Sequence, residues 1–405
     1  MQIRDYRIHS IAIADPPLRS AFGLHAPLAL RTVIELESVD GVIGIAETHG
    51  GDSPARALES LRPRVLGQNA TQLFVSLSDL QGQGTYRMAL AALEVASLDL
   101  IGKTVELPVH ALLGGKVRDK VPFSAYAFYK HAWGESKYGE ALTPEGLVTQ
   151  VQQLITDYGF GSVKLKAGVL EPDAEIDTIK LLRQTFGPKV PLRLDPNCVW
   201  SVETSVRAGR ALREELSDGG YLEDPAQGIQ GMAAVRAGLL AEGIQTPLAS
   251  NMAVTSFATL AEAHQHDACQ IVLGDHHYWG GLRAVAELGR VCETLGIGLS
   301  MHSNSHLGVS LMAMVHVAAA THRLLYACDT HYPWQSPDDE IIAEGRVPII
   351  DGNVPVPELP GLGITLNYDQ LEKLKERYKN SPYRVRDDVA EMRKHVSPNW
   401  ERRHW

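Results

Sequence analysis

The second half of the chain alternates short apolar runs with longer stretches in which apolar residues recur every three or four positions. The short runs are typical of strands covered on both faces, and the longer stretches of amphipathic helices. A polar residue ends each short run, and successive ones lie 24 to 29 residues apart. One strand, one helix and two loops take roughly 25–30 residues. In chain order the polar residues are Lys166, Asp195, Glu223, Asn251, Asp275, His302 and Asp329.

This repeat predicts an α/β fold in which the strands close into a barrel. In such a barrel the side chains that end the strands ring a single mouth, where the functional groups gather. We predict a modified (β/α)7β TIM-like barrel over residues 121–345.

The first 120 residues follow another pattern, which predicts an α+β capping domain. Apolar and polar residues alternate over 1–14, 30–40 and 41–50, as in antiparallel strands, and Asp40-Gly41 is typical of a hairpin turn. A helical pattern follows and is clearest over 88–103. After about residue 345 prolines interrupt the barrel pattern, and we expect the tail, about 346–405, to complete the capping domain.

Composition narrows the possible partners. A net charge of −10 and a pI near 5.9 argue against nucleic acid and anionic membranes. No secretory signal and no apolar run of about 18 residues is visible. The four cysteines show no metal-binding spacing, so we expect reduced thiols and a cytoplasmic location. We also expect a homo-oligomer.

Asp195, Glu223 and Asn251 end three successive predicted strands. Carboxylate and amide oxygens are hard ligands that suit Mg²⁺ and are poor for zinc. Any one of them could instead cap the following helix or occupy a polar turn. Three at consecutive strand ends favour a metal site.

Lys164 and Lys166 lie two apart in one predicted strand, so their side chains point the same way. Helices cover the outside of a barrel, which favours a register with both lysines inside. Each ammonium group disfavours the other's charge, so we expect one lysine with a lowered pKa, suited to act as a general base.

His302 ends the strand that follows the one ended by Asp275. A carboxylate on the neighbouring strand end can hold the imidazole and fix its tautomer. The alternative is a packing role, because the chain has 16 histidines. With a lysine and a histidine on opposite sides of a metal, the predicted site can remove a proton next to a carboxylate.

At this point the chain resembles the enolase superfamily, and most closely its glucarate dehydratase branch. The resemblance covers nearly the whole chain from GLHAP onward, and its most specific part surrounds His302. The matching segments are VKLKAGV, LDPN, EDP, ASNM, GDHHYW, MHSNSHLGVSLMAMVHVAAA, CDTHYPWQ, VPELPGLGI and VRDD.

The resemblance implies roles for individual residues. Asp195, Glu223 and Asn251 would bind Mg²⁺. Lys166 would be one acid/base, tuned by Lys164, and His302 with Asp275 the other. Asn304 would help to hold the site. The implied substrate contacts are His25, Tyr126, His331 and Arg386.

Four positions depart from that branch or cannot be matched securely. Ser20 stands where the family has a polar amide, His276 where it has proline, and Ser305 where it has a second asparagine. The segment that carries a threonine contact looks shortened, and Thr85 is a weak candidate for it. These departures lie near the expected substrate rather than near the metal.

The resemblance implies a Mg²⁺-dependent dehydratase of a six-carbon aldarate, a small sugar diacid. D-glucarate (and L-idarate) would give 5-keto-4-deoxy-glucarate by α-proton abstraction and loss of the β-hydroxyl. Another acid-sugar dehydratase or an epimerase of the superfamily is an alternative, because the same two bases could reprotonate the carbon. A non-catalytic glucarate dehydratase-related protein is a second alternative, although such a chain should have lost a base or a ligand. A zinc hydrolase would need a His-x-His on the first barrel strand, and VPFSAYAF has none.

Overall fold

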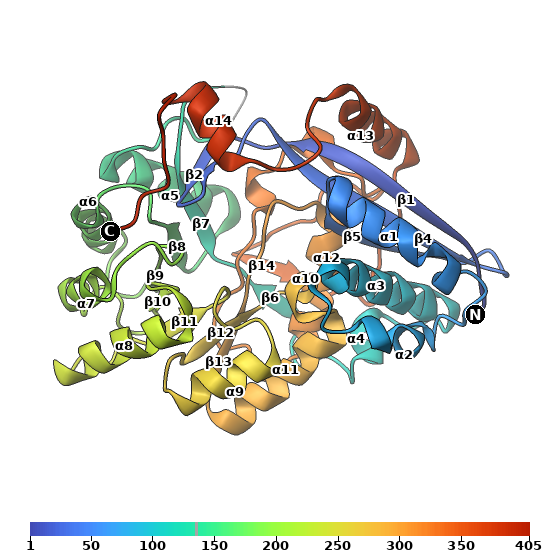
Figure 1. Cartoon of the computed structure of the whole chain (residues 1–405), viewed down its shortest axis with the longest axis horizontal. Coiled ribbons are helices and arrows are strands. Elements are labelled where there is room, and N and C mark those ends of the chain that lie inside the picture. Colours follow the sequence, from blue (N-terminus) through green and yellow to red (C-terminus); the bar gives the residue numbers. More distant parts are fainter. Residues whose placement is uncertain (134–136) are drawn as a thin grey trace.

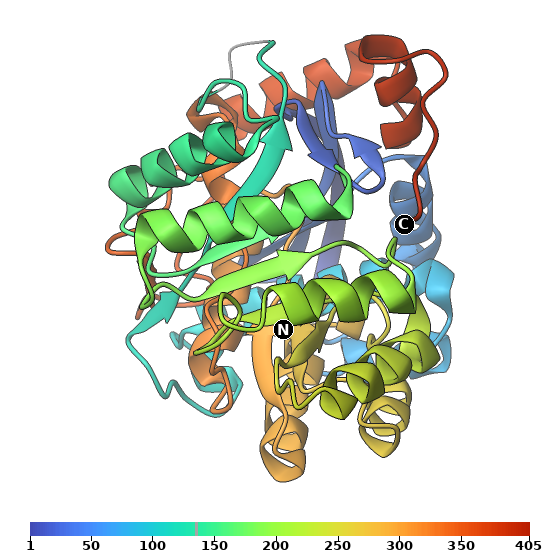
Figure 2. The ribbon, with the colours of Figure 1, turned by 90° about the vertical axis from the view of Figure 1, so that its left-hand side faces the viewer.

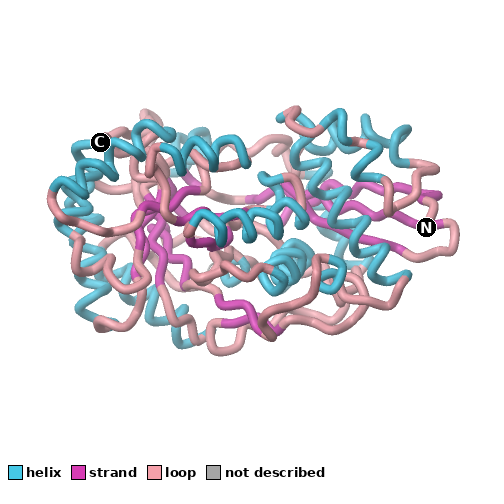
Figure 3. Tube along the Cα trace, turned by 90° about the horizontal axis from the view of Figure 1, so that it is seen from below, coloured by secondary structure: helices cyan, strands magenta, loops and turns pink. Residues whose placement is uncertain are grey.

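The computed structural model describes residues 1–133 and 137–405 and contains a barrel flanked by a strand-and-helix layer. In Figure 3 the strands of the barrel and those of the flanking layer lie on opposite sides of the molecule. The predicted fold class, a barrel with a capping domain, is confirmed. None of the described helices is both long and apolar enough to cross a membrane.

Seven parallel strands form the barrel wall, in the order in which they occur along the chain. The strands are β7 (Ala125–Lys130), β8 (Val163–Lys166), β9 (Leu192–Asp195), β10 (Tyr221–Glu223), β11 (Leu248–Ser250), β12 (Ile271–Gly274) and β13 (Gly298–Met301). Each strand after β7 ends at or next to a polar residue of the sequence repeat.

A segment near residues 324–329 closes the barrel between β13 and the start of β7. Leu324 bridges Leu299, and Cys328 bridges Phe123, both in parallel. The backbone N–H of Asp329 donates to Met301 O over 2.8 Å. Asp329 therefore joins the ring of strand-end side chains.

Helices surround the barrel and pack apolar side chains on the outward side chains of the strands. They are α5 (Pro144–Tyr158), α6 (Pro172–Phe186), α7 (Val202–Ala211), α8 (Gly228–Ala241), α9 (Phe257–Gln265), α11 (Leu282–Leu295) and α12 (Gly308–Ala320). Helix α12 is buried along almost its whole length. The short helix α10 (His276–Trp279) follows β12. Figure 2 shows α5, α6, α7 and α8 layered on the near side of the barrel.

The flanking layer is a three-stranded antiparallel sheet of order β1-β4-β5. Its strands are β1 (Ile3–Ala14), β4 (Leu28–Ser38) and β5 (Ile43–His49). Helix α3 packs against β4 and β5, and α1 against β1. The helices here are α1 (Asp52–Val65), α2 (Leu73–Ser76), η1 (Ser78–Leu80), η2 (Gly84–Tyr86), α3 (Arg87–Thr104) and α4 (Val109–Leu112).

Two small strands of the N-terminal segment leave this sheet and extend the barrel sheet. β2 (Leu18–Ser20) pairs antiparallel with β7, and β3 (Gly23–Leu24) pairs with β2. This hairpin carries its loop to the mouth of the barrel. Gly23 has a φ of 135°, and a Cβ there would collide with the Asp388 carbonyl, so only glycine permits the close approach to the tail.

The tail returns to both parts of the molecule. Helix α13 (Tyr368–Asn380) packs on β1, and α14 (Asp388–His395) packs on β3. Before them the chain forms η3 (Tyr332–Trp334), η4 (Pro337–Asp339) and β14 (Asn353–Pro355), which pairs with β6 (Lys120–Pro122). In Figure 1 the red tail crosses from α14 back to the barrel helices α6 and α7.

Candidate active site

The strand ends surround a cavity of about 660 Å³ at the mouth of the barrel. Eight of the predicted catalytic, metal-binding and substrate-binding residues line it, and they come from the barrel, the N-terminal loop and the tail. They are His25, Tyr126, Lys166, Asn251, His302, Asn304, His331 and Arg386. Lys164, Asp195, Glu223 and Asp275 are buried beneath or beside this lining.

Lys164 and Lys166 both point into the barrel, where carboxylates surround them. Lys166 Nζ lies 2.6 Å from Asp195 Oδ2. Lys164 Nζ lies 2.6 Å from both Glu223 Oε2 and Asp329 Oδ2, and 3.6 Å from Asp195 Oδ2. Three carboxylates therefore face two ammonium groups, which leaves one negative charge uncompensated.

The carboxylates set the direction of the lysine pKa values. Burial lowers the pKa of Lys166, but the neighbouring Asp195 raises it, and the net pKa lies above its usual value. Lys164 also lowers the pKa of Lys166, by less than Asp195 raises it. The expectation of a lysine with a lowered pKa is therefore wrong for these side chains alone, because the acids outweigh the lysine–lysine repulsion.

The three predicted metal ligands have oxygens that suit a cation. Within residues 1–133 and 137–405, the buried atoms Glu223 Oε1 and Asn251 Oδ1 have no hydrogen-bond donor, and Glu223 Oε2 lies against the Lys164 ammonium at 2.6 Å. Burial and the nearby Asp195 charge raise the pKa of Glu223 well above its usual value. A divalent cation would bind the buried oxygens that have no donor and would offset the negative charge of Asp195 and Glu223. The donor set therefore fits a hard metal ion.

Asp224, which the sequence reasoning did not single out, holds the third of these residues in place. Asp224 Oδ2 accepts the backbone N–H groups of Asn251 at 2.8 Å and Met252 at 3.0 Å, and its Oδ1 accepts the Ser250 hydroxyl at 2.6 Å. The only sequence signal was its position directly after Glu223 in EDP.

His302 and Asp275 meet as the sequence predicted for adjacent strand ends. His302 Nδ1 lies 2.9 Å from Asp275 Oδ2, and His302 lines the cavity. Because a carboxylate only accepts, Nδ1 carries a proton, and the neutral form of the ring has its lone pair on Nε2. Burial raises the pKa of Asp275, but His277 and His302 lower it more, so Asp275 stays ionised.

Aromatic and imidazole rings form one wall of the cavity. His331 lies against Tyr126, with ring centroids 4.9 Å apart, and stacks on His25 at 6.1 Å. Tyr126 OH and His25 Nδ1 are buried without hydrogen-bond partners among the described residues. Burial lowers the pKa of both His25 and His331, and nearby cations add to the effect at His25. The two rings are therefore neutral hydrogen-bonding groups.

Arg386 reaches the cavity from the tail, but another side chain already engages it. Arg386 Nε and Nη2 donate to the two oxygens of Asp388 at 2.6 and 2.9 Å. Asp388 Oδ2 also lies 3.9 Å from His25 Nε2. A substrate anion would share this guanidinium with Asp388 or displace that carboxylate.

Several further lining residues were not singled out from the sequence, although Asn197 lies in LDPN and Tyr278 in GDHHYW. Asn197 donates its backbone and side-chain N–H groups to Asp195 Oδ1, at 3.0 and 3.1 Å. Tyr278 OH lies 3.4 Å from Asn304 Nδ2, and its ring packs on His49 at 5.5 Å. His49 comes from β5 of the flanking sheet, so only tertiary packing brings it to the barrel mouth.

Of the positions that depart from the glucarate dehydratase pattern, only some lie at the cavity. Ser20 lines the cavity, and Ser305 donates to Asp15 from the loop after His302. His276 is buried beside Asp275. Thr85, the weak candidate for a threonine contact, is exposed in η2 and does not line the cavity.

Comparison with known proteins places this site in a family. Residues 146–370 match the model described as enolase C-terminal domain-like, and residues 8–114 match the mandelate racemase / muconate lactonizing enzyme N-terminal domain. A probable glucarate dehydratase of Streptomyces coelicolor is 44% identical, over 96% of this chain and 95% of its own.

Solved structures agree over the whole chain. An enolase from Thermobispora bispora, complexed with magnesium and formate, has a TM-score of 0.93 at 44% identity and covers 100% of this chain and 99% of its own. An enolase from Pseudomonas fluorescens, with bound magnesium, potassium and tartrate, has a TM-score of 0.91 at 43% identity and covers 99% and 98%. The chain belongs to the enolase superfamily.

Proposed function

We propose that this protein is a Mg²⁺-dependent acid-sugar dehydratase and that its substrate is a six-carbon aldarate, D-glucarate or its epimer L-idarate. The observation that carries the proposal is the placement of Lys166 and the His302–Asp275 pair around one cavity that also contains Asn251. The relative named a probable glucarate dehydratase supports the reaction class and the substrate.

Asp195, Glu223 and Asn251 are the proposed ligands of Mg²⁺. When bound, the ion would hold the substrate carboxylate and stabilise the negative charge that develops on it. The same charge would lower the pKa of Lys166, because Asp195 would then be shared between the ammonium group and the metal. Lys166 would thereby become a usable base.

The proposed reaction starts with removal of the α proton, by Lys166 on one face of the carbon or by His302 Nε2 on the other. The electron pair of the broken C–H bond forms a carbon–carbon double bond as the β C–O bond breaks. The base that took the α proton gives a proton to the departing hydroxyl, which leaves as water, so the base returns to its starting state. The resulting enol then converts to the keto acid.

The end of the substrate away from the proposed metal would contact other side chains that line the cavity. His25, His331 and Tyr126 offer neutral hydrogen-bonding groups, and Arg386 offers a positive charge. A second carboxylate is the substrate group that an arginine fork recognises most strongly. These contacts support a diacid over a monocarboxylic sugar acid.

The decisive experiment is a screen of aldarates and aldonates with Mg²⁺, read by semicarbazide detection of the keto product. We expect glucarate or idarate to react fastest, and we expect the His302→Asn variant to lose dehydration of one of these two epimers. If only aldonates react, the enzyme is a dehydratase of another acid sugar. If deuterium enters the α position without keto product, it is an epimerase, and if neither occurs, the chain is the non-catalytic relative.

A further inference from the structure

A second imidazole, outside the candidate catalytic set, is bound to the carboxylate that orients His302. His277 Nδ1 lies 2.9 Å from Asp275 Oδ1, and the His277 backbone N–H donates to the same oxygen at 2.8 Å. His302 takes the other oxygen, Oδ2. Both oxygens of Asp275 are therefore engaged, each by a different histidine, and the carboxylate cannot turn without breaking one contact.

The far side of His277 faces the flanking sheet rather than solvent. Its Nε2 lies 3.2 Å from the backbone oxygen of Glu47 on β5 and 3.3 Å from Ser310 Oγ on α12. The ring is buried. His277 thus spans from the barrel carboxylate to the strand that packs over it.

Chemistry fixes which nitrogen of His277 donates to Asp275. A carboxylate only accepts, so Nδ1 must carry a proton. Nε2 can then donate to the Glu47 carbonyl or accept from the Ser310 hydroxyl. In both states the Nδ1–H donor to Asp275 remains.

Glu47 makes this junction rigid. Its carboxylate accepts Arg31 Nε at 2.7 Å, Leu307 N at 2.9 Å and Ser310 N at 3.0 Å. Leu307 and Ser310 begin helix α12 just after the His302 loop. One residue of β5 therefore fixes both the ring of His277 and the start of the helix that follows His302.

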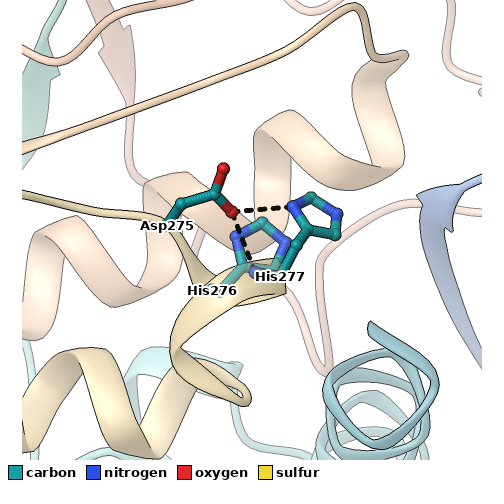
Figure 4. Close-up of side chains that lie close together, drawn as sticks. All are labelled: Asp275, His276 and His277. Carbon is teal, nitrogen blue, oxygen red and sulfur yellow. Dashed lines mark hydrogen bonds and ion pairs between the residues drawn. The ribbon is translucent and has the colours of Figure 1, made fainter. Parts of the chain in front are cut away.

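Asp275, His276 and His277 lie close enough to suggest a metal site instead (Figure 4). Two observations favour the hydrogen-bonded arrangement. The dashed lines of Figure 4 join Asp275 to His277, and His302 occupies its remaining oxygen. A metal ion would have to displace these donors, and the positive charge of Arg31, which lowers the pKa of His276, would oppose it as well.

We propose that His277 is a positioning residue for the His302–Asp275 pair, anchored by β5 of the capping domain. By holding Asp275 in one orientation, it would keep the His302 Nδ1–H bonded and the His302 Nε2 lone pair directed into the cavity. The inference rests on the proposed function only in assigning His302 as a base.

The test compares the two faces of the α carbon in a His277→Phe variant, which keeps the ring shape and removes both nitrogens. We expect kcat to fall roughly 10- to 100-fold for the epimer whose proton faces His302, as for a misplaced base. KM and the Lys166-dependent α-deuterium exchange of the other epimer should stay near their wild-type values. Equal losses on both faces would overturn the proposal.

Conservative variants and a neighbouring control sharpen the comparison. His277→Asn places an N–H near Nδ1 and should regain much of the rate, whereas His277→Gln places its donor near Nε2 and should not. Equal rates in these two variants contradict the inference, even if the phenylalanine variant does not fold. His276→Phe is the matched control, because His276 is equally buried and neither ring nitrogen has a partner among the described residues.

A second measurement needs no turnover. Nuclear magnetic resonance of protein carrying labelled histidine, with His302 assigned from the His302→Asn variant, reports the tautomer of that ring. We expect a single Nδ1–H form in the wild type and a mixture in His277→Phe. An unchanged tautomer rejects the role of His277, whereas absence of dehydration by the wild type rejects only the proposed function.

Discussion

The floor and the roof of the cavity are built in opposite ways. The floor consists of Lys164 and Lys166 on β8, Asp195 and Glu223 at the ends of β9 and β10, and Asp329 at the end of the closing segment, joined by charged contacts of 2.6 to 3.6 Å. The roof consists of Phe22 and His25 from the N-terminal loop with Arg386 and Asp388 from the tail. Its principal ion pair involves an arginine whose side chain is 38% exposed.

Because of this difference, we expect the floor to determine the reaction and the roof to determine which substrate fits. The barrel hydrogen bonds fix the floor side chains, so the groups proposed to act on the α carbon cannot move without disturbing the wall. The roof segments contact each other through side chains and one close backbone approach at Gly23. Substitutions in the roof should therefore change substrate fit while the proposed proton-transfer groups stay in place.

The largest expected effect comes from the floor. Asp195→Asn removes the charge of a proposed metal ligand and of the partner of Lys166, and we expect kcat to fall by at least about 10³-fold. Chelation should likewise abolish turnover of the wild type, and Mg²⁺ should restore it. Calorimetric titration with Mg²⁺ measures whether the variant has lost metal affinity. Full activity of the wild type after exhaustive chelation would contradict the metal assignment.

The next largest effect distinguishes the roles of the two proposed bases, His302 and Lys166. His302→Asn should lower the dehydration rate of one epimer by about 10²- to 10⁴-fold, the usual contribution of a general base. Lys166 should still exchange the α proton of the other epimer with deuterium, which proton resonance can follow. Wild-type dehydration of both epimers by the variant would mean that His302 is structural.

A smaller effect is expected from the roof. Arg386→Ala should raise KM for glucarate roughly 10- to 100-fold, the worth of one hydrogen bond to a charged group, with kcat little changed. Gluconate, which lacks the second carboxylate, should be almost unaffected. An equal loss for both acids would show that Arg386 supports the fold rather than the substrate, and would remove the main argument for a diacid.

Asp388 offers the complementary change. Asp388→Asn removes the charge that engages Arg386, so KM for glucarate should fall by a few-fold, about 0.5–1 kcal/mol. Steady-state kinetics at low salt would measure it, since salt screens exposed charges. A raised KM would instead indicate that Asp388 positions Arg386 for the substrate.

The smallest effect should come from the end of the tail. Arg402 lies over the Phe22 ring at 4.3 Å and donates to Asn197 O at 3.3 Å, so it ties the roof to the loop after Asp195. Arg402→Ala should raise KM a few-fold, in line with about 0.5–1 kcal/mol for an exposed cation–π contact. Arg403→Ala is the control, because Arg403 contacts Trp405 and Glu171 instead.

The sequence by itself determined the floor. A repeat of polar residues 24 to 29 positions apart predicted the barrel and the ends of its strands. Parallel strands in a closed barrel must present their carboxyl ends at one mouth, so Asp195, Glu223 and Asn251 had to lie on the same side. The His302–Asp275 contact followed from the same rule for neighbouring strands.

The tertiary structure decided what the repeat could not encode. The direction of the Lys166 pKa depends on distances to carboxylates, which spacing along the chain does not give. His49 and the Glu47–His277 contact depend on how β5 packs over the barrel, and Arg386 meets His25 through the fold of the tail. Local periodicity specifies backbone elements, whereas contacts between distant segments depend on side-chain packing that no single stretch of sequence contains.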